Sequence, residues 1–130
     1  MGQYAVQFAS LAGLRVISTS SPQNFDLVRS FGAAEVYDYA DSRTARKIFS
    51  ATSGKLTLAV DCISDGMTPA QVSGALSKEG GTIVTVLPYN SRKKGVNTEL
   101  ILVYSMWGEV RCLNIHKPVQ ILIDLYPRAT

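Results

Sequence analysis

The residues best placed for chemistry form a short polar turn, residues 18–24, directly after the apolar pair Val16-Ile17. Where a strand of this kind ends in an NAD-binding protein, an acidic residue binds the ribose 2′-hydroxyl. This turn contains no carboxylate, and its hydroxyl and amide groups could instead bind a 2′-phosphate through neutral hydrogen bonds. The other interpretation is that Ser21 is the N-cap of a helix whose first turn holds Pro22. Both can be true of Ser21.

A second candidate is Gly2, directly before a segment with helical spacing. A glycine there lets the backbone approach a phosphate, and a helix N-terminus offers free N–H groups. A full dinucleotide fingerprint needs G-x-G-x-x-G after a strand, and only one glycine is present here. Gly2 is therefore either a phosphate-contacting residue or an ordinary helix cap.

The cysteines and the histidine predict no metal or nucleophile site. Cys62, Cys112 and His116 lack a recognisable zinc-ligand spacing. No basic residue stands beside Cys62 in the sequence to lower the pKa of its thiol. We expect Cys62 to be a small buried packing residue.

The remaining charged and phenolic groups have ordinary interpretations as well. We expect Asp61 and Asp65 to be solvated or helix-capping carboxylates, and residues 92–94 to form a solvated basic loop, with contact to an anionic group as the alternative. Tyr89 and Tyr104 are available phenols for which packing is the expected use.

Alternating strand-like and helix-like segments must position these residues. Strands are expected at 15–17, 35–37, 56–63 and 82–87, and helices at 4–12, 22–31, 44–52 and 69–76. In the first helix Tyr4, Phe8 and Leu11 share one apolar face. Strands that alternate with helices predict a parallel sheet covered on both faces.

Both ends depart from this pattern. The sequence opens almost directly into a helix, whereas a doubly wound sheet normally begins with a strand. The alternation also stops after Glu109. Residues 111–130 contain one apolar run, 119–125, that could be a strand or a short helix. We therefore expect a domain at 1–110 and an unplaced tail at 111–130.

Composition narrows the class of protein. The chain has 130 residues, 46% of them apolar, and a net charge of +3. These values fit one globular domain with a single core and exclude a disordered chain. The charge is too small and too dispersed to predict a nucleic-acid partner. With no membrane-spanning run, no secretory signal and no disulfide framework, we expect a reduced, cytoplasmic setting.

Several short motifs occur in a characteristic order, at residues 2–7, 21–27, 32–39, 59–63, 80–81 and 107–109. Together they resemble the cofactor half of zinc-independent medium-chain dehydrogenases/reductases, and most of all the fungal trans-acting enoyl reductases that partner polyketide synthases. The resemblance covers roughly residues 2–110. It implies a Rossmann-like α/β fold, a doubly wound parallel sheet that is truncated here, without the first strand and the N-terminal barrel-like domain. Residues 1–110 would then be a partial NADP-binding domain.

The resemblance assigns roles residue by residue. The turn would hold the 2′-phosphate and adenosine of NADP(H) through Ser21, Pro22, Gln23 and Asn24. The family often has Lys or His where this chain has Gln23, so the phosphate would be held less strongly here. Gly2 also belongs to the implied cofactor site, and Tyr39 would lie against the adenosine.

Two further segments complete the implied site. Val86 and Leu87, at the end of the last clear strand, would approach the nicotinamide. The acyl-substrate pocket would be lined by Met106, Trp107, Gly108, Glu109 and Val110.

The implied reaction is hydride transfer from NADPH to an α,β-unsaturated, polyketide-like thioester, carried by a polyketide synthase in secondary metabolism. It needs no metal, and no residue of this chain is assigned as the catalytic acid. A catalytically inactive nucleotide-binding fragment and a quinone-reductase-like oxidoreductase are the alternatives. The sequence leaves the oligomeric state and the exact substrate open.

Overall fold

The computed structural model describes residues 2–100 and 120–127. Within them, one six-stranded sheet has the order β2-β1-β6-β3-β4-β5. Its strands are β1 (Leu14–Ser20), β2 (Glu35–Asp38), β3 (Leu58–Asp61), β4 (Gly81–Thr85), β5 (Val96–Leu100) and β6 (Gln120–Pro127). The helices are α1 (Gly2–Leu11), the 3-10 helix η1 (Pro22–Asn24), α2 (Phe25–Ser30), α3 (Thr44–Ala51) and α4 (Thr68–Ala75). The expected α/β fold is confirmed.

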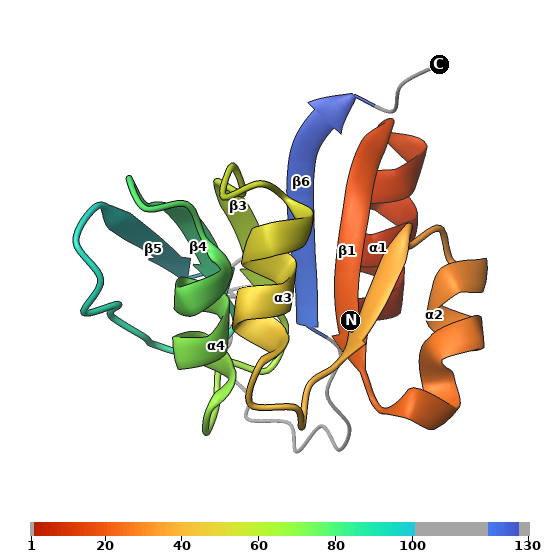
Figure 1. Ribbon diagram of the computed structural model, residues 1–130, viewed down its shortest axis with the longest axis horizontal. Helices are drawn as coiled ribbons and strands as arrows, with labels where there is room; N and C mark the ends of the chain where they lie inside the picture. Colours follow the sequence, from red (N-terminus) through yellow and green to blue (C-terminus); the bar gives the residue numbers. More distant parts are fainter. Residues whose placement is uncertain (1, 101–119, 128–130) are drawn as a thin grey trace, which may run out of the picture.

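The helices form a layer on each side of the sheet, α1 and α2 on one face and α3 and α4 on the other (Figure 1). Each face has its own apolar cluster. Ile17 and Ile83 of the sheet pack with Ile48 and Val72 beneath α3 and α4. Val16 packs with Val6 and Val28 beneath α1 and α2. Adjacent residues of β1 thus bury opposite faces, as the period of two in a strand requires.

The first helix packs through a face other than the expected one. Tyr4, Phe8 and Leu11 are 66%, 70% and 83% exposed. The buried residues of α1 are Gly2, Val6 and Ala9. The expectation was wrong because both sets recur at spacings of three and four, and small side chains let the helix lie closer to the sheet than bulky ones do.

The run at 119–125, which the sequence left open between strand and helix, contains most of β6. This strand runs antiparallel to both neighbours, with Ile17 opposite Leu122 and Ala59 opposite the same residue. Every other strand pair is parallel. The sheet is therefore mixed rather than parallel throughout. The direction of β6 follows from the topology, because β5 ends and β6 begins at the same edge of the sheet.

One close backbone contact fixes where β4 and β5 start. Gly80 has a φ of 103°, and a Cβ atom placed on it would collide with the carbonyl group of Gly95. Only glycine combines this backbone conformation with this approach. Among the described residues, no helix is long and apolar enough to cross a membrane.

Candidate cofactor site at the carboxyl edge of the sheet

The parallel strands β1, β2, β3 and β4 end at one edge of the sheet, and expected site residues follow β1, β2 and β4. Register pairs Ser20 with Asp38 across β1 and β2, and Asp61 with Thr85 across β3 and β4. Gln120 of β6 lies opposite both Thr19 and Asp61, so the two pairs belong to one continuous edge. In open α/β sheets, ligands bind in the crevice outside the carboxyl ends of the strands.

The turn after β1 is held by its own polar groups. The buried Ser20 hydroxyl donates to the Ser21 carbonyl over 3.1 Å. The Asn24 side-chain amide donates to Ser21 Oγ over 3.1 Å, and the Asn24 backbone N–H donates to the Ser21 carbonyl over 2.9 Å. Ser21 and Asn24 therefore present a hydroxyl and an amide side by side.

The capping interpretation of Ser21 is only half right. Ser21 occupies the N-cap of η1 with an extended backbone and Pro22 behind it, but its side chain makes no capping hydrogen bond. Its Oγ accepts from Asn24 instead. Pro22 and Gln23 are exposed beside them.

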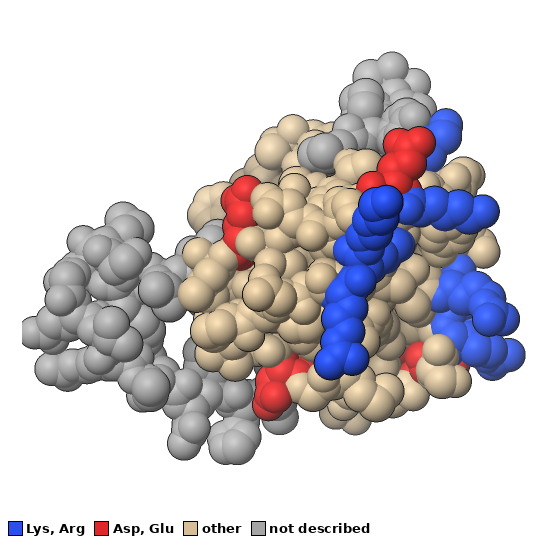
Figure 2. Space-filling view, turned by 90° about the vertical axis from the view of Figure 1, so that its left-hand side faces the viewer, with Lys and Arg blue, Asp and Glu red and all other residues tan. Residues whose placement is uncertain are grey.

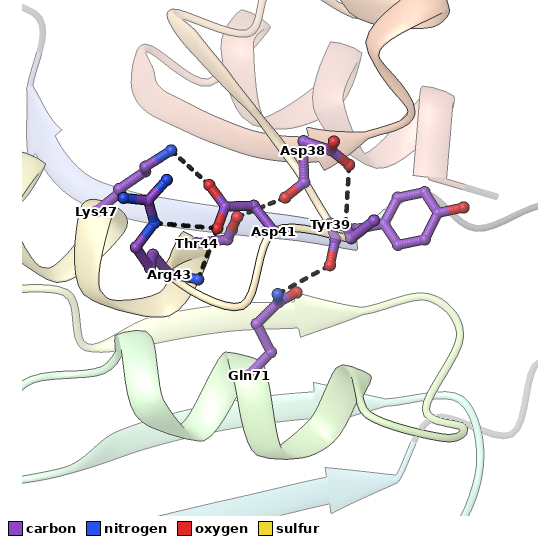
Figure 3. A network of polar contacts seen from close by, with 8 residues as sticks. Asp38, Tyr39, Asp41, Arg43, Thr44, Lys47 and Gln71 are labelled. Carbon is purple, nitrogen blue, oxygen red and sulfur yellow. Dashed lines mark hydrogen bonds and ion pairs between the residues drawn. The ribbon is translucent and has the colours of Figure 1, made fainter.

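Tyr39 ties the end of β2 to the end of β1. Its backbone N–H donates to the Ser20 carbonyl over 3.4 Å, and its side chain is 37% exposed. Gln71 of α4 donates its amide to the Tyr39 carbonyl over 3.1 Å (Figure 3). The structure thus brings Tyr39 to the β1 turn. Gln71 is a supporting residue that no sequence motif marked.

A second polar cluster follows β2 (Figure 3). Asp41 accepts hydrogen bonds from Lys47 Nζ at 2.6 Å and from the Arg43 backbone N–H at 2.8 Å. The bond from Lys47, followed by that from Arg43, lowers the pKa of Asp41 to about 2. Thr44 anchors the cluster to the strand by donating its hydroxyl to the Asp38 carbonyl.

Lys and Arg side chains form a band on one side of the molecule (Figure 2). Arg43, Arg46 and Lys47, on and beside α3, are exposed. An open hollow of about 510 Å³ between α3 and α4 is lined in part by Arg43, Arg46 and Phe49. Because Asp41 pairs with Arg43 and Lys47, the positive surface beside α3 is partly neutralised.

On the other half of the edge, Asp61 organises the turn after β3. Its side chain is fully buried, which corrects the expectation of a solvated carboxylate. Asp61 Oδ1 accepts the backbone N–H groups of Ile63 and Ser64 at 3.0 and 2.8 Å, and Oδ2 accepts the Thr68 hydroxyl at 3.0 Å. Since each backbone N–H needs a partner in a buried turn, this carboxylate has a structural role.

Ser64 connects that turn to the end of β4. Its backbone has a φ of 55°, and its Oγ accepts the backbone N–H of Val86 over 3.0 Å. Val86 is half-buried and Leu87 is 48% exposed. Both lie at the carboxyl edge, as expected. The expected substrate residues Met106, Trp107, Gly108, Glu109 and Val110 lie outside the described residues, as do Tyr104, Cys112 and His116.

Cys62, Lys93 and Tyr89 take part in packing or hydrogen bonds within the fold. Cys62 is half-buried, and burial, reinforced by the Asp61 charge, raises the pKa of its thiol to about 11. Lys93 does not extend into solvent, because Nζ donates to the carbonyls of Ser73 and Leu76 at 3.0 and 2.8 Å, closing the end of α4. Burial lowers the pKa of Lys93. Tyr89 likewise contacts Ser73 through its hydroxyl at 3.4 Å.

Comparison with known proteins identifies the family. The family model described as zinc-binding dehydrogenase matches residues 1–104. The chain belongs to this family. Among the side chains that the structure describes, within residues 2–100, no three His, Cys, Asp or Glu come together to hold a metal ion.

Among the curated relatives of this chain are fungal trans-enoyl reductases. ACTTS2 of Alternaria alternata is 43% identical over 108 residues, which are 82% of this chain and 32% of the relative. TwmE of Talaromyces wortmannii is 37% identical over 113 residues, 84% of this chain and 31% of the relative. The enzyme thnE of Trichoderma harzianum is 37% identical over 112 residues, with 82% and 30% covered. The chain thus spans about a third of the length of these relatives, and the family expected from the motifs is confirmed.

Proposed function

We propose that this chain is the NADP(H)-binding part of an enoyl-reductase-type oxidoreductase. The observation that carries the proposal is the turn after β1, where Ser21 and Asn24 present a hydroxyl and an amide at the carboxyl edge. No carboxylate lies between Ser20 and Asn24, so the acidic residue that would select NAD at this strand end is missing. Asp26, the first acidic residue along the chain, is exposed and pairs with Arg29.

In this proposal each group at the edge has a distinct task. Ser21 and Asn24 donate hydrogen bonds to the 2′-phosphate, and Tyr39 flanks the adenosine. The N-terminus of α1, at Gly2, lies at the same edge and offers backbone N–H groups to the pyrophosphate. Val86 and Leu87 border the nicotinamide. When bound, the nicotinamide supplies the hydride, and the chain's contribution is to bind and orient it.

The substrate class is inferred from the relatives. Their names describe trans-enoyl reductases, and one relative from Aspergillus terreus is named a dual trans-enoyl reductase/FAD-dependent monooxygenase. We therefore propose that the substrate of the complete enzyme is an α,β-unsaturated thioester carried by a polyketide synthase. Residues 106–110 would line its acyl pocket, and the enzyme would act in the cytoplasm.

The binding proposal is tested by thermal melts of the 130-residue chain with NADPH, with NADH and without a nucleotide. A ligand at 100 times its Kd stabilises the native state by about 2.7 kcal/mol. In a domain of this size that raises the melting midpoint by several degrees. We expect NADPH to raise the midpoint more than NADH at equal concentration. A midpoint indifferent to both nucleotides would refute the proposal.

Two substitutions in the turn test the assignment of the 2′-phosphate. Gln23→Lys adds a cation beside Ser21, and we expect about tenfold tighter NADPH binding, equivalent to about 1.4 kcal/mol, with NADH unchanged. Ser21→Asp should repel the phosphate and shift preference toward NADH. Ser30→Ala on α2 is the matched control, because the exposed Ser30 hydroxyl bonds only locally to the Leu27 carbonyl. Equal effects on both nucleotides would show that the phosphate lies elsewhere.

Turnover is tested separately, by following NADPH oxidation in the presence of a short α,β-unsaturated acyl thioester. Binding accompanied by oxidation supports a reductase. Binding without oxidation supports the alternative of a nucleotide-binding module whose catalysis needs further residues.

A further inference from the structure

The position of β6 has no counterpart in the expected topology. In the doubly wound order 3-2-1-4-5-6, the strand between the second and fourth strands is the one that leads into the first helix. In this chain β1 follows α1, and β3 and β4 follow in turn, so that β1 corresponds to the second strand and β3 to the fourth. The slot between them holds β6 instead (Figure 1).

The strand in this slot, β6, joins two otherwise separate sets of strands. Without β6, the sheet consists of a β2-β1 pair and a β3-β4-β5 group. The residues of β1 from Val16 to Ser20 are buried in the closed sheet, where β6 supplies the backbone partners on this side of β1. An unpaired buried N–H or C=O costs about 1–3 kcal/mol. A strand in this slot is therefore required for the sheet to close.

The segment between β5 and β6 is long enough that it does not determine which slot β6 occupies. Nineteen residues, 101–119, separate the end of β5 from the start of β6. The two strands lie three strand spacings apart in the sheet, about 14 Å at 4.8 Å per spacing. Nineteen residues can span about 60 Å when extended. The connection therefore does not force β6 into the slot of its own chain.

We propose that the slot between β1 and β3 is a strand-acceptor site whose occupant is the segment 120–127. The segment inserts antiparallel and pairs through backbone hydrogen bonds with both β1 and β3. The inserted segment can come from the same chain, from a second copy of the chain or from a free peptide of this sequence. The proposal concerns only the backbone pairing within the sheet, so a failure to bind nucleotide would not contradict it.

The direction and register of the insertion are tested by cross-linking in the full-length chain. In a background of Cys62→Ala and Cys112→Ala, Val16→Cys is combined with Ile123→Cys, its Cα partner across the β1–β6 ladder. The matched control combines Val16→Cys with Gln120→Cys, whose partner in the register is Thr19. Thr19 lies three residues beyond Val16, which corresponds to about 10 Å along the strand. That distance exceeds the Cα separation of about 7 Å that a disulfide tolerates.

We expect a disulfide in the Ile123 pair at a yield at least tenfold above that of the Gln120 pair under mild oxidation. Mixing isotopically distinct chains before oxidation then separates links within a chain from links between copies by mass. Equal yields, or a higher yield in the Gln120 pair, would overturn the proposal.

The acceptor property is tested with a fluorescently labelled peptide of residues 118–129. Leu122→Pro removes a backbone N–H in the middle of β6 and should release the chain's own strand. Its matched control is Thr98→Pro in β5, at the edge of the sheet, which leaves β6 in place. We expect the peptide to bind the Leu122→Pro chain at least tenfold more tightly than the control.

A peptide N-methylated at Leu122 keeps its side chains and loses one N–H donor. It should bind at least tenfold more weakly than the unmodified peptide, because both sides of a central strand are paired. Equal binding of the N-methylated and unmodified peptides would overturn the proposed acceptor site. Equal binding of the unmodified peptide to the Leu122→Pro and Thr98→Pro chains would overturn it too. A Leu122→Pro chain that binds no peptide would overturn it as well, while the cross-linking of the otherwise native strand would still decide the register.

Discussion

Replacing Asp61 tests how far one buried carboxylate holds the carboxyl edge together. Asp61→Ala leaves the backbone N–H groups of Ile63 and Ser64 without their acceptor, whereas the Thr68 hydroxyl keeps a second acceptor at the Asp65 carbonyl. Two unsatisfied donors at about 1–3 kcal/mol each give a loss of about 2–6 kcal/mol. That is a large part of the 5–15 kcal/mol that typically stabilises a domain.

Asp61→Asn separates the geometry from the charge. The Asn side chain keeps one carbonyl oxygen for the two backbone N–H groups, and its NH₂ group can donate to the Thr68 hydroxyl in place of Oδ2. Only the assistance of the negative charge is lost, and we expect a destabilisation of about 1 kcal/mol. The predicted gap between Asp61→Ala and Asp61→Asn is therefore at least about 1 kcal/mol, with Asp61→Ala the less stable.

The assay is urea unfolding followed by far-ultraviolet circular dichroism, which reports on the helices and strands directly. Asp65→Ala serves as the control, because Asp65 is exposed and its carboxylate bonds only the neighbouring Gly66 N–H; its effect should stay within about 0.5 kcal/mol. Hydrogen exchange of the Val86 amide should accelerate in Asp61→Ala, since Ser64 links the two turns. Equal losses in the Ala and Asn variants would refute the reasoning.

Three further predictions address other parts of the fold. Gly80→Ala should destabilise the chain by about 1–3 kcal/mol in urea unfolding, because the new Cβ meets the Gly95 carbonyl at a φ of 103°; an unchanged midpoint would contradict this. Ser53→Gly should raise stability by about 0.5 kcal/mol, because exposed Ser53 has a left-handed φ of 52°, and a lower thermal midpoint would count against it. Burial, followed by the hydrogen bond to Glu35, raises the pKa of Tyr37 to about 12. Because this pKa exceeds the unfolded value of about 10, the stability Tyr37 contributes is complete below pH 10 and lost as the pH rises toward 12. The Tyr37 pKa is measured by ultraviolet titration, as the difference from a Tyr37→Phe variant. Glu35→Gln should lower this pKa, and an unchanged pKa would exclude the role of Glu35.

The parts of the fold that the sequence predicted are those with local signals. The segments expected at 15–17, 35–37 and 82–87 coincide with β1, β2 and most of β4, because short apolar runs between glycines and polar turns have few other ways to become buried. The turn from Ser21 to Asn24 was also predicted, since proline and small polar residues define it locally. Tyr39 lies beside the β1 turn because parallel strands bring their carboxyl ends to one edge, and its place against the adenosine stays a prediction.

The features that the sequence missed depend on partners far along the chain. The strand β5 alternates weakly and carries Asn97 and Glu99, so its pairing with β4 at the sheet edge left no strong pattern. The buried face of α1 could not be chosen from spacing, because two faces qualified and the distance to the sheet decided between them. From the sequence Asp61 was expected to be a solvated or helix-capping carboxylate, because the two backbone N–H groups that it binds become its neighbours only when the turn forms.

The central place of β6 also determines when the sheet can close during synthesis. Its partners on β1 and β3 are about a hundred and about sixty residues earlier in the sequence. Such distant pairings are slow to form, because the ends of long loops must first be brought together. A ribosome makes residues 120–127 last among the strands described, so β1 and β3 emerge with one unpaired edge each. Exposed edges of this kind pair readily with other chains, and the last strand to be made is therefore the one that ends that exposure.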